Sequence, residues 1–190
     1  MDRRQEILEA ATKSFSLFGY KGTTMEQVAK IANVGKGTIY TFFSNKEEIL
    51  KEVVMSLIKE MKVAMDATID TNQSFTENGH SVLMKMLEFR ERHVLFAKLI
   101  EEEKELRTPA VKQMLQDIES EGISYIASRI ETGISKGEVH ECDAPLVAYL
   151  LFKSYLAFVV DWQQIHDEPM GEDQILDIFK QTIFRGLQKQ

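Results

Sequence analysis

Apolar residues recur at intervals of three and four along nearly the whole chain, which is the spacing of one helix face. In the first segment Ile7, Ala11, Phe15 and Phe18 share such a face, and Gly19 stands where a helix usually ends. No segment shows the strict alternation of a half-buried strand. The pattern therefore predicts an all-α protein.

The second expected helix begins with a capping signal. It runs from about Met25 to Ala32, and Thr23 or Thr24 precedes it as N-cap. Glu26 or Gln27 stands close enough in the sequence to complete a capping box with that threonine.

A turn of three residues joins this helix to a short third one, expected from about Lys36 to Phe43. Asn33 stands in the turn, where a residue that tolerates left-handed backbone is needed. A long fourth helix follows, with an apolar stripe from Leu50 to Met65. Two helices joined by so short a turn predict a helix-turn-helix.

Helical spacing continues to the C-terminus with a few breaks. Residues 70–79 are expected to form a loop or a frayed helix end, after which apolar spacing resumes at Val82 and continues to Ile100. Further helices are expected from Pro109 to about 136, across 146–162 and across 173–188. The segment 146–162 is the most apolar, yet a bilayer span needs about 20 apolar residues and Lys153 interrupts this one. We therefore expect a soluble helix that is buried on most sides.

Composition and charge narrow the function classes. The chain of 190 residues is 44% hydrophobic and 28% charged, as is usual for a soluble globular protein. Its single cysteine, Cys142, allows no internal disulfide, and the N-terminus lacks the apolar core of a signal peptide, so a cytoplasmic location is expected. Residues 1–50 carry a net charge of +1, which leaves −8 for the rest of a chain whose total is −7. Only the first part therefore suits a polyanionic partner.

The expected third helix divides into two faces. Ile39 and Phe43 are four residues apart and point inward, whereas Phe42 is ambiguous between the edge of the core and a contact with DNA sugars and thymine methyls. The outward face carries a cation, a position without a side chain, two hydroxyls and a phenol, which suit a DNA groove. These outward residues are Lys36, Gly37, Thr38, Tyr40 and Thr41.

The stretch ILEAATKSFSLFGYKGTTMEQVAKIANVGKGTIYTFFSNKEEIL resembles the N-terminal domain of TetR-family transcriptional regulators almost end to end. The resemblance implies about nine helices, a helix-turn-helix DNA-binding domain over residues 1–46, and a C-terminal helical ligand-binding and dimerisation domain over 47–190. It also implies that the third helix reaches double-stranded DNA, that Thr24 places its hydroxyl on a phosphate, and that Lys46 contacts the DNA backbone. The turn departs from the family's usual Gly and Ser, since this chain has Asn33 and Gly35.

The apolar segment 146–162 spans more than one face, so we expect a second copy of the chain to cover part of it. The family resemblance likewise implies a homodimer, held by a four-helix interface of the last two helices from each subunit. The interface residues expected are Leu150, Ala157, Phe158, Ile175, Phe179 and Ile183.

The middle of the chain is expected to bind a small lipophilic or amphipathic effector, such as a fatty acyl compound or a drug-like cation. Methionines make adaptable apolar cavities, although they can equally be ordinary core, and polar side chains at apolar spacing can orient a ligand or form surface ion pairs. The pocket residues expected are Met61, Met65, Met86, Phe89, His93, Phe96, Met114, Ile118, Tyr125, Phe152 and Lys153.

Catalysis and metal binding are not expected. Glu138, His140, Cys142 and Asp143 lie close together but match no standard tetrahedral ligand set, and no catalytic motif appears, so neither a cofactor nor a membrane partner is expected.

The function that these features predict is a repressor released from a palindromic operator by a small molecule. A DNA-bound structural or cell-division factor without an effector stays open, and a packed domain without a cavity over residues 82–160 would favour it. A helical ligand-binding protein that has lost DNA contact is disfavoured by the intact outward face of the third helix.

Overall fold

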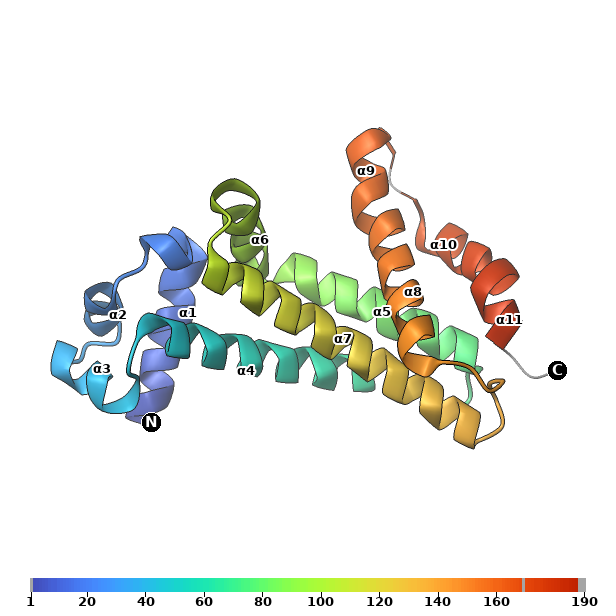
Figure 1. Cartoon of the computed structure of the whole chain (residues 1–190), viewed down its shortest axis with the longest axis horizontal. Helices are drawn as coiled ribbons and strands as arrows, with labels where there is room; N and C mark the ends of the chain where they lie inside the picture. The colour runs from blue at the N-terminus through green and yellow to red at the C-terminus, as the bar shows by residue number, and fades with distance from the viewer. Residues whose placement is uncertain (1, 169, 188–190) are drawn as a thin grey trace. The chain divides into compact units, whose positions relative to one another are not determined.

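The computed structural model describes residues 2–168 and 170–187, and these residues form the expected all-helical fold (Figure 1). Within them there are nine continuous helical stretches and no strand, because α8, η1 and α9 follow one another without a break, as do α10, η2 and α11. The elements are α1 (Arg3–Gly22), α2 (Met25–Ile31), α3 (Lys36–Phe42), α4 (Lys46–Asp66), α5 (Phe75–Arg92), α6 (Val94–Leu106), α7 (Pro109–Ser135), α8 (Ala144–Leu156), η1 (Ala157–Asp161), α9 (Trp162–Ile165), α10 (Glu172–Phe179), η2 (Lys180–Phe184) and α11 (Arg185–Leu187).

The chain forms two compact units. The first runs to Glu60 and also contains Arg90–Ile118, and the second contains Met61–Phe89 and the residues from Glu119. Helices α4, α5 and α7 therefore each contribute residues to both units.

In the first unit α1 packs against α2 and α6. Its expected inward face is confirmed for Ile7, Ala11 and Phe15, whose side chains have no exposed surface. Phe18 was expected on the same face, but 51% of it is exposed. Phe18 is exposed because it lies directly before Gly19, where a φ of 72° interrupts the regular helix and ends the apolar face.

Two expected local structures of the first unit are confirmed. Of the two candidate caps of α2, the residue that serves is Thr24, whose Oγ1 accepts from the backbone N–H of Gln27 at 3.2 Å. The side chain of Gln27 in turn accepts from the N–H of Thr24 at 2.7 Å, which completes the capping box. Asn33 has a φ of 54°, the left-handed backbone that the turn between α2 and α3 requires.

One expectation about the middle of the chain was wrong. Residues 75–79 are helical, because Ser74 and Glu77 form a capping box that starts α5: each side chain binds the other's backbone N–H, at 3.3 and 3.0 Å. The apolar run from Val82 to Ile100 is divided between α5 and α6, because His93 has extended backbone and serves as the N-cap of α6.

The second unit has a core built from the end of α4, from α5, α7 and α8, and from the C-terminal helices. Tyr155 and Phe179 lie with ring centroids 4.1 Å apart, and both side chains are almost wholly buried. His80 of α5 joins them, with its Nδ1 2.8 Å from the hydroxyl of Tyr155. The helices that carry the C-terminal part of the chain thus pack onto α5 around aromatic side chains.

One helical stretch among the described residues, Ala144–Asp161, is long and apolar enough to cross a membrane by length and composition alone. That is weak support for a membrane span, because core helices of soluble proteins meet the same criteria. About half of each of Tyr149 and Leu150 is exposed on this stretch, so α8 presents an apolar face outside its own core.

Candidate functional site

Helices α2 and α3 form a helix-turn-helix whose inner faces hold it together. Val28 and Ile39 have no exposed surface, and Ala29 and Phe43 are 5% and 1% exposed. The inward positions of Ile39 and Phe43 are therefore confirmed. Gly35 is the N-cap of α3 and has no side chain to bind the first N–H groups of that helix.

The other face of α3 is open to solvent. Lys36, Gly37, Tyr40 and Thr41 are exposed, and Tyr40 retains 48% of its surface. Thr38 is half-buried. The hydroxyl of Thr41 donates to the carbonyl of Thr38 at 2.7 Å, so it is held against its own helix. Phe42 is 37% exposed, which places it on the solvent side of the helix and not in the core.

Lys36 forms an ion pair with Glu26, which links the start of α3 to the first turn of α2. The hydrogen bond and charge of Glu26 raise the pKa of Lys36, and the same bond lowers the pKa of the Glu26 carboxyl. Both side chains are exposed, so a DNA phosphate has access to the ammonium and would compete with the carboxylate of Glu26.

Lys46, at the start of α4, is held by the protein itself. Its ammonium donates to the carbonyls of Tyr20 and Thr23, at 2.7 Å each, and lies 4.3 Å from the centre of the Tyr20 ring. Partial burial lowers the pKa of Lys46, and the charge of Glu102 acts in the opposite direction. The phosphate contact expected of Lys46 stays a prediction. In this structure the side chain also links the start of α4 to the carbonyls of Tyr20 and Thr23.

Glu102 of α6 holds the same turn from the other side. It is 4% exposed, and its carboxylate accepts from the N–H of Tyr20 at 2.6 Å and from the N–H of Lys21 at 3.1 Å. A Cβ added at Gly19 would lie 2.6 Å from the Oε2 atom of Glu102. Only a glycine therefore allows this carboxylate to reach the end of α1, and the sequence pattern gave no sign of the contact.

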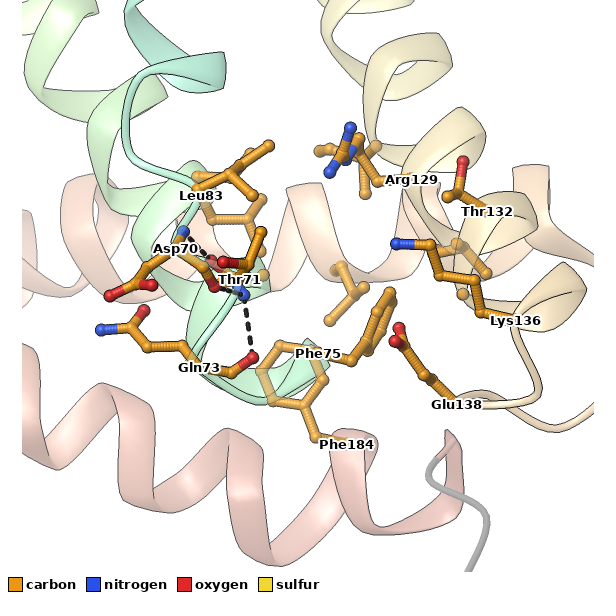
Figure 2. A pocket seen from close by; sticks show the side chains of 18 residues that line it. Asp70, Thr71, Gln73, Phe75, Leu83, Arg129, Thr132, Lys136, Glu138 and Phe184 are labelled. Atoms are coloured by element: carbon orange, nitrogen blue, oxygen red, sulfur yellow. Dashed lines mark hydrogen bonds between the residues drawn. The ribbon is translucent and has the colours of Figure 1, made fainter.

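The second unit contains a cavity of about 160 Å³ (Figure 2). Its wall comes from the segment after α4, from α5 and α7, and from Leu151 and Phe184 nearer the C-terminus. The lining is mixed, and its apolar part includes Phe75, Val82 and Ile130. The polar residues that line it are Asp70, Thr71, Gln73, Asn78, Arg129, Thr132, Lys136 and Glu138.

None of the residues expected in the effector pocket lines this cavity. Met61, Met65, Met86 and Phe152 are buried in the core of the second unit. Met114 and Phe96 are buried within the first unit, while Phe89 and Ile118 are half-buried. Their contact with an effector stays a prediction.

The polar members of that set have other contacts. His93 borders a groove of the first unit with Leu8 and Leu57. Tyr125 donates a hydrogen bond to Asp66, the last residue of α4. Lys153 forms an ion pair with Glu119 at 2.6 Å.

The residues expected at a dimer interface divide into two groups. Leu150 is 50% exposed and Ala157 is exposed, so both are available to a partner. Phe158 and Ile183 are half-buried. Ile175 and Phe179 are each 1% exposed and belong to the core of the protomer. Leu146 and Tyr149, two of the residues by which segment 146–162 was expected to span more than one face, extend the exposed apolar face of α8 with 64% and 50% of their surface free.

The loop between α7 and α8 has a structural explanation. Asp143 caps α8 by accepting from the N–H of Leu146 at 3.0 Å, and the N–H of His140 donates to the carbonyl of Leu187 at 2.8 Å. No group of three or more His, Cys, Asp or Glu side chains that could hold a metal occurs in the described part of the chain.

Residues 7–53 match the family model described as bacterial regulatory proteins, tetR family. Over 187 residues the chain is 46% identical to the HTH-type transcriptional regulator YhgD of Bacillus subtilis, covering 98% of this chain and 97% of that one. It is 26% identical to the HTH-type transcriptional repressor AcnR of Corynebacterium efficiens, covering 97% and 94% of the two chains.

The fold is similar to that of the transcriptional regulator FadR of Bacillus subtilis, solved in complex with stearoyl-CoA. The TM-score is 0.67 at 24% identity, with 96% of this chain and 98% of that chain covered. The similarity to YhgD spans nearly the whole of both chains and so includes the second unit as well as the helix-turn-helix.

Proposed function

The chain belongs to the TetR family of bacterial transcriptional regulators, and we propose that it is a cytoplasmic, homodimeric repressor released from a palindromic operator by a small amphipathic molecule. The observation that carries this proposal is the outward face of α3, where exposed groups able to contact DNA stand on a helix anchored from behind by Ile39 and Phe43.

DNA contact is proposed for α3 and its surroundings. Tyr40 and Thr41 face bases or phosphates, and Gly37 lets the DNA backbone come close to the helix. Lys36 is proposed to exchange its ion pair with Glu26 for a phosphate, which has the same charge as the carboxylate. Thr24, whose Oγ1 already accepts one hydrogen bond, has a hydroxyl hydrogen left to donate to a phosphate.

Two copies of the chain are proposed to meet through the exposed face of α8. Leu146, Tyr149 and Leu150 leave at least half of their surface free, which is unusual for large apolar side chains on one helix face. A symmetric pair reads a palindrome when its two recognition helices lie about 34–36 Å apart, or a multiple of that distance.

The cavity of the second unit is proposed as the effector site. Its wall includes Ile69, Asp70 and Thr71, which follow directly after the end of α4 at Asp66. A ligand there would act on the end of α4, and the hydrogen bond from Tyr125 to Asp66 joins the same end to α7. We propose that a bound ligand displaces α4. This displacement lowers operator affinity, because α4 begins directly after the helix-turn-helix.

The alternative without an effector, a DNA-bound structural or cell-division factor, is less well supported. It predicts a packed second unit, whereas this unit contains a cavity with charged groups in its wall. The stearoyl-CoA complex of FadR supports a lipophilic effector for that relative. The cavity here is smaller than the about 300–1,000 Å³ usual for ligand pockets, which favours a smaller effector for this chain.

The proposal is tested by selecting duplexes from a random pool with the full-length protein and measuring binding of the selected sequence. We expect a palindrome, bound by a dimer, whose half-sites are about one helical turn or a multiple apart. A selected sequence without two-fold symmetry, or the absence of any selection, would contradict a dimeric operator-binding repressor.

A further inference from the structure

The charged groups of the cavity are not equally available to a ligand. The Oδ1 atom of Asp70 accepts hydrogen bonds from the backbone and side-chain nitrogens of Asn72, at 2.8 and 2.9 Å. Its carboxylate therefore stabilises the turn after α4, and Figure 2 shows it pointing away from the cavity. Glu138 is the remaining carboxylate in the wall.

Two cations near the C-terminal end of α7 face the same space. Arg129 lies on α7 and Lys136 follows its last residue, Ser135; both line the cavity, and Figure 2 shows both on the same side of it. Neither forms an ion pair or a side-chain hydrogen bond with any part of the chain that the structure describes. With Asp70 engaged, the cavity has two available positive groups and one available negative group.

The apolar wall is held in place by a glycine. A Cβ at Gly133 would lie 2.7 Å from Cγ2 of Val139 and 2.8 Å from Cε2 of Phe75, so only glycine lets the Phe75 ring pack against α7 there. Phe75 and Phe184 form the aromatic part of the wall, and Leu83 and Ile130 also line the cavity. The cavity has about the volume of an engineered apolar cavity that binds benzene, roughly 150 Å³.

We propose that this cavity binds a small amphipathic carboxylate, with an apolar body about the size of a benzene ring against Phe75 and Phe184 and its carboxylate on Arg129 and Lys136. Guanidinium and ammonium groups bind carboxylates through charge-assisted hydrogen bonds, and an arginine can do so in two-point fashion. This proposal rests on the proposed function, because it names the chemical class of the effector that the repressor would bind. It replaces the two classes considered from the sequence, fatty acyl compounds and cations, with a short anion.

The test uses the full-length protein and four probes: benzoate, hexanoate, benzyl alcohol and benzylamine. Calorimetric titration gives the affinity of each, and thermal unfolding gives an independent readout, because a ligand that binds the native state raises Tm. We expect both carboxylates to bind and to raise Tm, with the alcohol and the amine at least tenfold weaker. Absence of binding by both carboxylates, or equal binding by the alcohol or the amine, would overturn the proposal.

Variants locate the site. Arg129→Gln and Lys136→Gln should each weaken benzoate binding roughly tenfold, as expected for one charge-assisted hydrogen bond. Glu138→Gln should leave it unchanged or tighter, because it removes a negative charge beside the anion. Lys104→Gln changes an exposed lysine of α6 in the first unit and serves as the matched control. An equal loss in the control and in the cavity variants would show that the effect is not local.

The DNA experiment is kept separate so that the two proposals can fail independently. Operator affinity is measured with and without saturating benzoate. Release of the DNA supports the effector role, whereas an unchanged affinity contradicts that role and leaves the binding site, judged by titration and variants, standing.

Discussion

At the residue scale, Glu102 shows how one buried charge fixes a local structure. It is buried, and its carboxylate accepts hydrogen bonds from the backbone N–H groups of Tyr20 and Lys21. Residue 19 is a glycine because a Cβ there would collide with this carboxylate. Charged side chains are almost never fully buried without such partners. The turn that connects α1 to α2 is therefore held by a side chain from a helix distant in sequence.

Replacing Glu102 by alanine should destabilise the protein by about 2–4 kcal/mol, because the N–H groups of Tyr20 and Lys21 lose their acceptor in a buried place. Glu102→Gln keeps one acceptor oxygen and should cost about half as much. Urea unfolding measures both, with Glu105→Ala, an exposed neighbour on α6, as control. Equal stability of the Glu102 and Glu105 variants would show that the contact is not stabilising.

His80 should make stability depend on pH. Burial lowers its pKa in the folded state, with Glu172 and Asp173 opposing and Lys180 reinforcing that shift. The unfolded state then binds a proton near the ordinary value of about 6.5 while the folded state does not. The contribution is fully present above that pH and is lost as pH falls toward the folded pKa.

Urea midpoints at neutral and mildly acidic pH check this prediction. The natural protein should lose stability between them, and His80→Gln, which keeps a polar partner for Tyr155, should lose less. The charges at positions 172, 173 and 180 stay in both proteins, so the difference reports the imidazole. Parallel pH profiles would contradict the prediction.

At the element scale, the helix-turn-helix was largely readable from the sequence, whereas the sites around it were not. The cap Thr24, the turn residue Asn33 and the inward pair Ile39 and Phe43 follow from local rules of backbone and periodicity. The capping box of Ser74 and Glu77 is an equally local signal, and it marks the start of α5 within the segment expected to be a loop.

The cavity and the burial of Ile175 and Phe179 were beyond such rules. An apolar stripe on the last helix predicts that the stripe is covered, but not whether the same chain or a second copy covers it. The cavity likewise depends on Phe184 lying against α5, since a Cβ at Gly79 would lie 3.5 Å from the Phe184 ring. Packing between distant segments decides both, and periodicity carries no information about it.

The ion pair between α2 and α3 should restrain DNA binding. Glu26→Gln frees Lys36 for a phosphate and removes a negative charge near the DNA, so affinity should rise for every duplex. The dependence of log K on log salt should become steeper by about one phosphate contact, a slope change of roughly 0.9. Lys36→Gln should have the opposite effect.

Anisotropy titrations at several salt concentrations measure both slopes. Glu9→Gln removes the same charge from another helix and serves as control. If it changes affinity and slope as much as Glu26→Gln does, the effect is one of net charge and the ion pair has no specific influence.

At the scale of the whole molecule, the charge distribution constrains how the protein meets DNA. The total charge is −7, which disfavours long-range attraction to DNA, so the proposed contact relies on local groups such as Lys36 and the exposed face of α3. The exposed apolar face of α8 is the second feature that a single copy of the chain leaves uncovered. A dimer accounts for both, since two copies double the local DNA contacts and cover that face.

Leu150→Arg should therefore give a monomer in sedimentation experiments at micromolar concentration and should weaken operator binding by at least tenfold. A charge introduced into an apolar interface is buried without a partner when the dimer forms. Met55→Arg changes a side chain of α4 that is equally exposed, at 50%, and should leave the dimer intact. A dimer that survives Leu150→Arg contradicts this interface.

The measurement that bears most directly on the proposed function compares specific and non-specific DNA affinity of the natural protein and of Tyr40→Ala. The Tyr40 ring is half exposed on the outward face of α3, so its loss should weaken binding to the selected operator by about 1–3 kcal/mol and binding to random duplex much less. Tyr40→Phe, which removes only the hydroxyl, should have an operator affinity between those of the natural protein and Tyr40→Ala. Equal losses on operator and random duplex would contradict recognition of DNA by this face.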